Sequence, residues 1–470
     1  MKSKILIMLA LAGLSSCSKQ LDKIPDNRAI ITTPAQVSML LTAAYPHATY
    51  MLFTEAMSDN VEDKGNSAAG ISPLAYQLNQ TSFQYKDPVT EDGPDLPITY
   101  WQACYHAIAV ANTALSFCHG PDSVSYQAQK GEALLCRAYA HFMLTVLFTK
   151  TYDPLTAVAD PGVPYLMDVS NQVFRTFDRG TVAGDYAAIE KDLLEGLPLI
   201  DESSYGSVPK FHFNLQAANA FASRFYLFRQ DYDKCLKYAK AVFGSKDPVQ
   251  IIRDEETIFA TMQYSEIAQE YTSSGENSNL LLQEVNSEYP ANYASLRFGL
   301  GNDKHNAFFS GNATGGQYAT TIYGASPQFF NIPKFYTNVV PLLSAEEVLF
   351  NKAEAELKLG DNASAIADLN TWASRNIANY DPVANLLTQD ILASYYGQPA
   401  VNAIFQCIMD FKRIAYLQEG LRWLDLLRLH TNITHSVTGS STILLSADDP
   451  RRLLQLPAEA VGEGMPLNPR

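Results

Sequence analysis

The sequence predicts a mainly α-helical protein built of tetratricopeptide-like helical hairpins, with a large, irregular, loop-rich subdomain laid over them. Three observations support this prediction. Apolar residues recur three or four positions apart over long stretches, which is the spacing of amphipathic helices. A helix–turn–helix pattern occurs twice, and such hairpins bury their apolar faces only by stacking on one another. Between the two copies, residues 245–343 are rich in Gly, Asn, Ser and Tyr and lose the helical periodicity.

The helices are expected in the following order. A helix over residues 34–57 begins with proline, which suits the first helical position because its missing N–H would be unpaired there anyway. Residues 58–97 are loop-rich, and a loop of this length is unusual in a compact domain unless it has a function. The chain becomes strongly helical from Tyr100, and further helices are predicted over 127–148 and 181–199 from their apolar spacing.

The internal repeat aligns Leu227–Leu236 with Leu357–Ile366. Each copy reads as helix, short turn, and a second helix of small and apolar residues. Asp231 and Asp361 stand where a helix N-cap is wanted, since a carboxylate there accepts hydrogen bonds from free backbone N–H groups. Gly360 falls just after the first helix of its copy, where a left-handed residue often ends a helix.

We expect one domain over residues 34–470, although a prior of ~150 residues per domain would suggest about three. One continuous helical array can use the whole length. The helical frame is expected at about 100–244 and 344–430. The irregular ligand-loop region is expected at about 58–97 and 245–343.

Composition excludes some classes of function. Hydrophobic residues make up 47% of the chain, which excludes disorder. Lys and Arg number 34 and Asp and Glu 49, giving a net charge of −15, so the surface repels phosphate backbones and no nucleic-acid partner is expected. Only 18% of residues are charged and 26 are Tyr, which suits a neutral or hydroxyl-rich ligand.

The N-terminus predicts export and lipid anchoring. Lys2 and Lys4 precede a short apolar run that is too short to span a bilayer, so residues 1–16 read as a signal peptide. Small residues lead to Cys17, as at the lipidation site of bacterial lipoproteins, and residues 17–33 would form the leader from the membrane. The alternative is an ordinary secretory signal with a chance cysteine. Any membrane contact would be through the anchor, because no later segment could span a bilayer.

No cofactor, metal site or catalytic constellation is predicted. The histidines form no HExxH motif, and no G-x-S-x-G sequence is present. A glycosidase-type pair of carboxylates stays open as an alternative, because carboxylates are plentiful. The cysteines after the lipidation site are expected to be buried free thiols; they are Cys104, Cys118, Cys136, Cys235 and Cys407.

Two loop regions offer the chemistry that recognises sugars. Flat aromatic faces cover sugar C–H groups, and amides and carboxylates around them pair with hydroxyls. The ligand-binding candidates are Asp59, Asn60, Tyr76 and Tyr85 in the first region, and Tyr289, Asn292, Tyr293, Arg297, Phe308, Tyr318 and Tyr323 in the second. Trp101 closes the first region but lies in an apolar helical pattern, so it is expected in the core.

Six segments in order resemble the SusD/RagB family of Bacteroidetes-type surface lipoproteins. Their order along the whole chain is more specific than any one motif. They are the leader Cys17–Asp22, the Y-x-x-I-x-x-A-N helix at Tyr105–Asn112, the stretch Gly131–Phe142 followed by Gly162–Tyr165, the E-A-x-x-x-L-G match within Glu354–Asp361, the E-G-x-R-W-x-D-L-x-R match at Glu419–Arg428, and the closing segment from Arg452 to Pro469.

The resemblance implies a frame of about four tetratricopeptide-like hairpins in a non-enzymatic protein at the cell exterior that caps a SusC-like TonB-dependent transporter of the outer membrane. It would bind oligosaccharide or polysaccharide and deliver it for import, with peptides as the alternative cargo and a surface glycan-degrading enzyme as a further one. The E-G-x-R-W motif can be a ligand clamp or a structural ion network. The structural interpretation is favoured for Glu419, Arg422, Trp423, Asp425 and Arg428, because the motif is family-wide whereas ligands differ.

Overall fold

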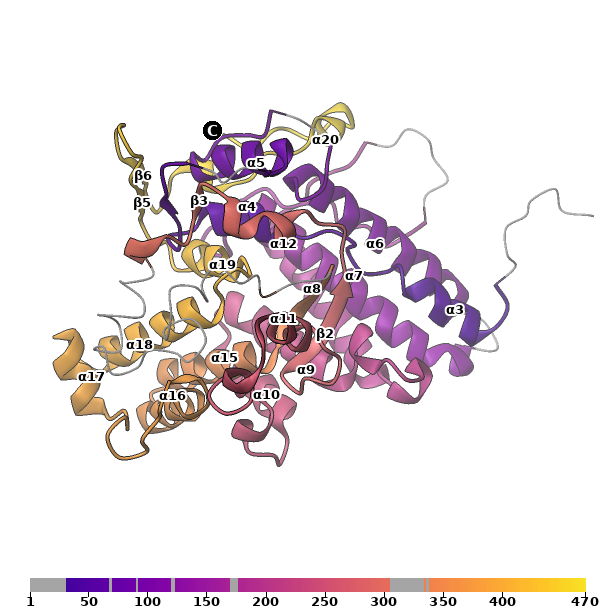
Figure 1. Ribbon diagram of the computed structural model, residues 1–470. Coiled ribbons are helices and arrows are strands. Elements are labelled where there is room, and N and C mark those ends of the chain that lie inside the picture. Colours follow the sequence, from indigo (N-terminus) through magenta and orange to yellow (C-terminus); the bar gives the residue numbers. More distant parts are fainter. Residues whose placement is uncertain are drawn as a thin grey trace, which may run out of the picture.

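The computed structural model describes residues 31–66, 70–89, 92–119, 123–169, 176–304, 334 and 338–470. The lipidation candidate Cys17 and the ligand candidates Phe308, Tyr318 and Tyr323 lie outside these residues. Within them the chain is mainly helical with short two-stranded sheets, which confirms the predicted fold class (Figure 1).

The helices and strands of the N-terminal part centre on two long helices. Those described are α3 (Pro34–Leu41), α4 (Met51–Met57), β1 (Glu62–Asp63), α5 (Pro73–Phe83), α6 (Pro97–Phe117), α7 (Gln127–Phe148), α8 (Val182–Gly196), α9 (Leu215–Phe228) and α10 (Tyr232–Phe243). Helix α7 has the predicted bounds 127–148 and packs against α6 on one side and α8 on the other. Nearly every residue of α7 after its first turn is buried, and its alanines and Gly131 let the neighbouring backbones come close.

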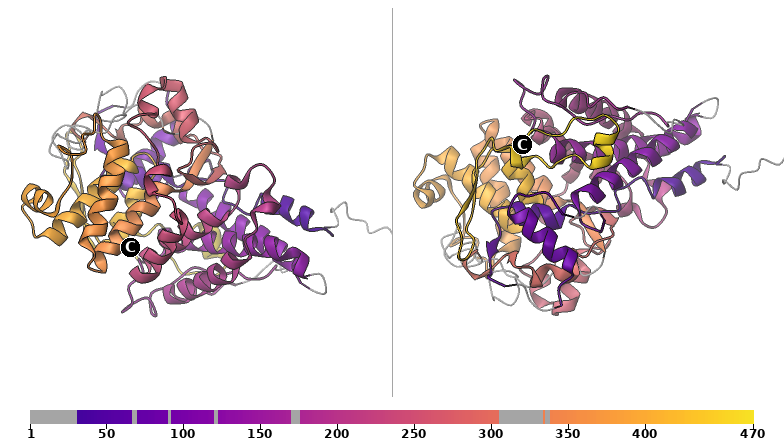
Figure 2. Two further views of the ribbon diagram at one scale, coloured as in Figure 1. Left: turned by 90° about the horizontal axis from the view of Figure 1, so that it is seen from below. Right: turned by 90° about the horizontal axis from the view of Figure 1, so that it is seen from above.

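The C-terminal part continues the helical frame. Its described elements are α11 (Tyr264–Tyr271), β2 (Asn279–Glu284), α12 (Tyr289–Asn292), β3 (Phe298–Gly299), β4 (Val339–Ser344), α15 (Ala345–Lys358), α16 (Asn362–Asn376), α17 (Gln389–Tyr396), α18 (Ala400–Ala415), α19 (Leu421–Arg428), β5 (Ile433–His435), β6 (Ile443–Leu445) and α20 (Ala458–Gly462). Helices α16 to α18 lie at one end of the molecule and α6 and α7 at the other (Figures 1 and 2).

The predicted internal repeat is present in three dimensions. Helices α9 and α10 form one hairpin, α15 and α16 form the other, and α10 packs on α15. Asp231 caps α10 by accepting from the N–H of Lys234, and Asp361 caps α16 in the same way. The residue before each cap has a left-handed backbone, with φ of 64° at Gln230 and 90° at Gly360. The two turns are therefore built alike, although only one has the glycine that this conformation favours.

The described chain contains three antiparallel strand pairs, of which two connect segments distant in sequence. Strand β2 pairs with β4 over Asn279–Glu284 and Val339–Ser344, and β5 pairs with β6. Strand β1 pairs with β3, with Glu62 opposite Gly299 and Asp63 opposite Phe298. The last pair joins the two regions that were predicted separately as ligand loops.

One local prediction was wrong and another was incomplete. The single helix expected over residues 34–57 is two helices, α3 and α4, because Pro46 has no N–H to donate and keeps the preceding residue out of helical geometry. The region 58–97, expected to be loop-rich, contains the 11-residue helix α5. Pro73 begins this helix, and its inner face buries Leu78 and Phe83.

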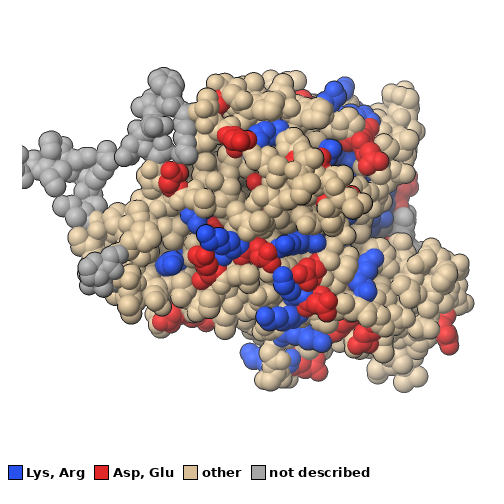
Figure 3. Space-filling model, turned by 180° about the vertical axis from the view of Figure 1, so that it is seen from behind, with Lys and Arg blue, Asp and Glu red and all other residues tan. Residues whose placement is uncertain are grey.

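The core of the described chain is one large cluster that extends from Val37 to Met465, with a small second cluster formed by Val61, Phe83 and Phe298. All five cysteines in the described part of the chain are free and buried, and burial raises the pKa of each thiol. None of the described helices is both long enough and apolar enough to cross a membrane. On the face in Figure 3, basic and acidic side chains are interleaved and large areas carry no charge.

Candidate functional site

The two predicted ligand-loop regions meet at the β1–β3 pair. Arg297, just before β3, donates to both carboxylate oxygens of Asp63 on β1, at 2.7 Å each. These two hydrogen bonds bring the pKa of Asp63 down to about 2. The side-chain oxygen of Asn292 accepts from the backbone N–H of Ser72, at 3.0 Å. We call the surface formed by residues 59–63, 72–85 and 292–304 the loop face.

Beneath the loop face lies a stack of three rings. Phe83 is fully buried, with the ring of Phe298 3.9 Å away on one side and the ring of His435 4.1 Å away on the other, both nearly parallel to it. Asn79 fixes Phe298 in place, because its side-chain amide donates to the Phe298 carbonyl and accepts from the Phe298 N–H. The aromatic residues of this stack serve to pack the loop face onto the helical frame.

Asp59 is held by two arginines. Arg422 donates to both carboxylate oxygens, at 2.8 and 2.9 Å, and Arg413 approaches one of them at 3.1 Å. Burial would raise the pKa of Asp59, but the charges of Arg413 and Arg422 outweigh it and hold the pKa well below its usual range. Asn60 is buried and accepts from Arg413 at 2.9 Å.

The tyrosine candidates are mostly buried. Tyr85 is 4% exposed and donates to the carbonyl of Met57 at 3.1 Å. Tyr289 and Tyr293 are buried against each other, with ring centroids 5.6 Å apart. Asn292 is also buried. Among the described candidates, Asp59, Tyr76 and Arg297 keep a partly exposed side chain on the loop face.

The E-G-x-R-W segment lies inside an ion network of the helical frame. Arg428 donates to both oxygens of Glu354 at 2.6 Å and to Asp425 at 2.7 Å, and Lys412 donates to the same oxygen of Asp425 at 2.9 Å. Burial would raise the pKa of Asp425, but these cations lower it to about 2. At the start of the segment, Glu419 accepts from Lys334 and Tyr271, and the Trp423 side chain is fully buried.

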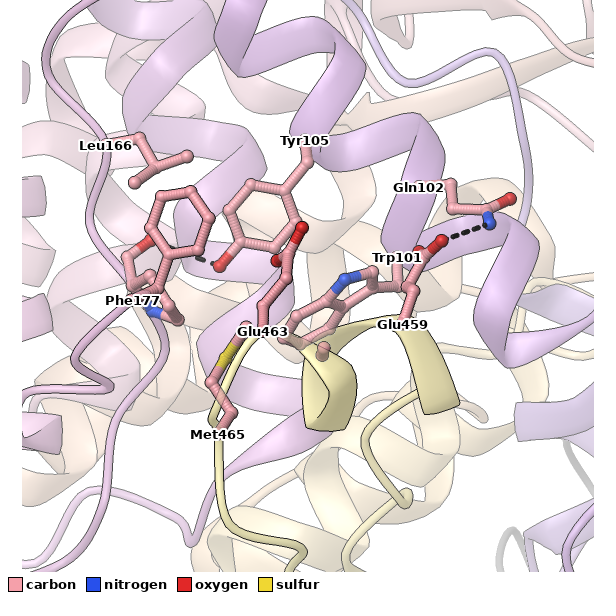
Figure 4. A pocket seen from close by; sticks show the side chains of 10 residues that line it. Trp101, Gln102, Tyr105, Leu166, Phe177, Glu459, Glu463 and Met465 are labelled. Carbon is pink, nitrogen blue, oxygen red and sulfur yellow. Dashed lines mark hydrogen bonds between the residues drawn. The ribbon is translucent and has the colours of Figure 1, made fainter. Parts of the chain in front are cut away.

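A separate pocket opens between α6, the segment before α8 and α20 (Figure 4). Its volume is about 320 Å³, which is at the lower end of the range for small-molecule sites. The lining is aromatic and apolar, with an amide and two carboxylates. The lining residues are Trp101, Gln102, Tyr105, Pro164, Leu166, Phe177, Glu459, Ala460, Glu463 and Met465.

Hydrogen bonds fix the pocket on two sides. The hydroxyl of Tyr105 donates to the carbonyl of Pro164 at 3.1 Å, and the amide of Gln102 donates to Glu459 at 3.1 Å (Figure 4). Trp101 lies 4.9 Å from Tyr105 between ring centroids and is almost wholly buried, so it forms the inner wall. Partial burial, and then the charge of Glu459, raise the pKa of Glu463.

Sequence reasoning did not find this pocket. Trp101 is buried, as expected, yet it also lines a cavity. Tyr105 belongs to the Y-x-x-I-x-x-A-N motif, which does not predict that its ring lines a cavity. The other walls come from Pro164, Leu166 and Phe177 and from residues 459–465, and no local pattern brings such distant segments together. A second, more polar cleft of about 490 Å³ lies between residues 149–160, 427–453 and the C-terminus.

The described residues contain no group of three or more His, Cys, Asp or Glu side chains placed to hold a metal ion. The pocket beside α20 offers aromatic surfaces, an amide and carboxylates on a helical frame.

Comparisons with known proteins show that other proteins share this helical frame. A family model described as SusD-like, "starch-binding associating with outer membrane", matches residues 19–227. A SusD superfamily protein from Bacteroides thetaiotaomicron has the same fold, with a TM-score of 0.67 at 18% identity, covering 93% of this chain and 100% of that one. The chain has the SusD-like fold. No curated protein matches it.

Other SusD-like structures show the same fold at similarly low sequence identity. A SusD superfamily protein from Bacteroides fragilis gives a TM-score of 0.68 at 18% identity and covers 93% of this chain and 99% of its own. A laminarin-binding SusD-like protein gives 0.58 at 15% identity, covering 93% of this chain and 100% of its own. The SusD-like fold thus accounts for the frame as a whole, while the family model covers the part up to α9.

Proposed function

We propose that this protein is a cell-surface, lipid-anchored binding protein that captures oligo- or polysaccharide and delivers it to a SusC-like TonB-dependent transporter, without chemical turnover. The observation that carries the proposal is the match of residues 19–227 to a starch-binding, outer-membrane-associated family. The laminarin-binding relative of the same fold supports a glycan as cargo. Cys17 would carry the anchor and place the protein at the outer membrane, facing outward.

The geometry supports binding of a sugar at two places. The loop face presents Asp59, Tyr76 and Arg297 at its surface and is tied to the frame by paired strands and ion pairs. The pocket beside α20 combines aromatic rings with carboxylates and an amide. Both are held on rigid helices, which keeps the ordering cost of binding low.

Isothermal titration calorimetry of the mature protein with a glycan panel tests the proposal. The panel contains soluble starch, laminarin, other neutral polysaccharides and amino-sugar oligomers, with a peptide pool from digested protein alongside. Heat from any of the glycans, with no heat from the peptides, is the expected result. Heat from the peptides alone would replace glycans by peptides as the cargo, and release of shorter sugars from a bound glycan would overturn the non-enzymatic role.

The transporter partnership needs its own test. Outer membranes solubilised in mild detergent should yield a TonB-dependent transporter when the protein is captured by a C-terminal tag. A Cys17→Ala variant, which has no thiol to acylate, is expected in the soluble extract instead of the membrane. Recovery of the wild-type chain without any β-barrel transporter would contradict the delivery role.

A further inference from the structure

The pocket beside α20 has a one-sided charge. Among the described residues that line it, the charged side chains are those of Glu459 and Glu463, and none is a Lys or an Arg. Across the described part of the chain, neither carboxylate forms an ion pair, and the polar partner of Glu459 is the neutral amide of Gln102. Burying two carboxylates under a neutral ligand would cost free energy, because both would lose water without gaining a counter-charge.

The aromatic lining, like the two carboxylates, favours a positively charged ligand. Trp101 and Tyr105 lie side by side with ring centroids 4.9 Å apart, and Phe177 faces the pocket from the segment before α8 (Figure 4). Aromatic faces attract cations, and groups of such rings are a known means of holding an ammonium group. The pocket thus combines three aromatic rings with two carboxylates, and a volume of about 320 Å³ limits the guest to a small group.

We propose that this pocket binds an amino-sugar residue with a free amine, its ammonium group held between the carboxylates of Glu459 and Glu463 and its C–H face against the aromatic rings. The choice of a sugar as the carrier of the ammonium group rests on the proposed function. The proposal adds a substrate class, namely glycans that contain unacetylated hexosamine. It also adds a site separate from the loop face.

Competitive binding among matched sugars tests the assignment. The probes are β-1,4-linked trimers of glucosamine, N-acetylglucosamine and glucose, which share linkage and length and differ in charge. The full chain is titrated with each, and tryptophan fluorescence and calorimetry are recorded together. Trp101 lines the pocket, whereas Trp372 and Trp423 are buried elsewhere, so occupation should change the emission of Trp101. The glucosamine trimer is expected to bind about tenfold more tightly than either neutral trimer, and less tightly in high salt.

Carboxylate-to-amide variants locate the charge effect. Glu459 and Glu463 are exposed at the rim, so E459Q and E463Q should fold normally. Each should reduce the preference for glucosamine, and the double variant should abolish it. Asp390→Asn is the matched control, because Asp390 is exposed on α17, which lies at one end of the molecule and well apart from α20 (Figures 1 and 2). It should leave the preference unchanged.

The outcomes separate this proposal from the proposed function. Equal binding of the three trimers, or a glucosamine preference that survives in the double variant, overturns the amino-sugar site and leaves the glycan-binding role standing. Stronger binding of a lysine-rich peptide than of the glucosamine trimer also overturns it. Absence of heat from every glycan in the larger panel is the result that would reject the proposed function itself.

Discussion

Arg422 holds Asp59 through two parallel hydrogen bonds of 2.8 and 2.9 Å, which tie helix α19 to the loop face. The pair joins a residue of the E-G-x-R-W motif to a residue predicted from its loop as a ligand contact. Because both side chains are largely buried, the pair acts as a charged clamp between frame and loop.

Asp59→Asn should therefore lower stability. The amide leaves two buried arginines without their counter-charge, and a loss of about 2–3 kcal/mol in the free energy of unfolding is expected. Urea denaturation at pH 7 measures it, with Asp390→Asn as an exposed control expected to change little. A loss of glycan affinity without any loss of stability would instead assign Asp59 to cargo binding.

The ion pair between Arg224 and Glu347 is more deeply buried. Arg224 donates to both oxygens of Glu347 at 2.5 Å and also to the carbonyl of Leu342, linking α9 to α15. Arg224→Met should destabilise the protein by about 3–5 kcal/mol, because it leaves a buried carboxylate alone. The double variant R224M/E347L should lose clearly less free energy of unfolding than Arg224→Met alone, as measured by urea denaturation. A double variant as unstable as the sum of both single variants would contradict this account.

Local patterns predicted the helical frame well. Helix α7 has its predicted bounds because its apolar spacing, its length and its small residues all favour one helix. The repeat was visible for the same reason: Asp231 and Asp361 cap their helices through bonds only three residues away. The prediction of one long helix over 34–57 was wrong because it followed the apolar spacing and gave too little weight to Pro46, which interrupts the helix.

The site depends on contacts that spacing does not reveal. The β1–β3 pairing brings Asp63 to Arg297, and the pocket brings Trp101 to Phe177 and Glu463. The two loop regions were predicted from composition alone, which did not indicate the pocket. Composition also does not distinguish a tyrosine that packs, such as Tyr289, from one that faces solvent. That distinction is set by tertiary packing.

Asp185 gives a pH dependence of known sign. It lies in the first turn of α8, where burial raises its pKa to about 8 although it accepts from the N–H of Val163 at 2.9 Å. A raised folded-state pKa means that the folded protein keeps a proton that the unfolded chain releases near its ordinary pKa of about 4. The protonated form therefore contributes stability at low pH that is lost as the pH rises through about 8.

Asp185→Asn removes this titration. Relative to the wild type, the variant should gain on the order of 4 kcal/mol in free energy of unfolding between pH 5 and pH 8. Urea denaturation of both proteins across that range measures the difference, which cancels titrations that they share. A difference that stays constant with pH, or that changes in the opposite direction, would show that Asp185 is ionised in the folded state.

The two repeat turns allow a matched test of backbone strain. Gly360 has a φ of 90° and open space where a side chain would begin, so Gly360→Ala should cost about 1 kcal/mol through strain alone. Gln230 has the corresponding left-handed backbone in the other copy, with an exposed side chain, so Gln230→Gly should stabilise by a few tenths of a kcal/mol to about 1 kcal/mol. Thermal unfolding of both variants measures the effects, and the same sign in both would contradict a shared turn geometry.

The buried cysteines make site-specific labelling practical. Because all five described thiols are buried and their pKa values are raised, they should react slowly with maleimides. A cysteine introduced at the exposed Val461 of α20 would then be the fast-reacting thiol within the described chain. An environment-sensitive dye at that position would sit beside Glu459 and Glu463 and could report cargo arriving at the pocket in living cells.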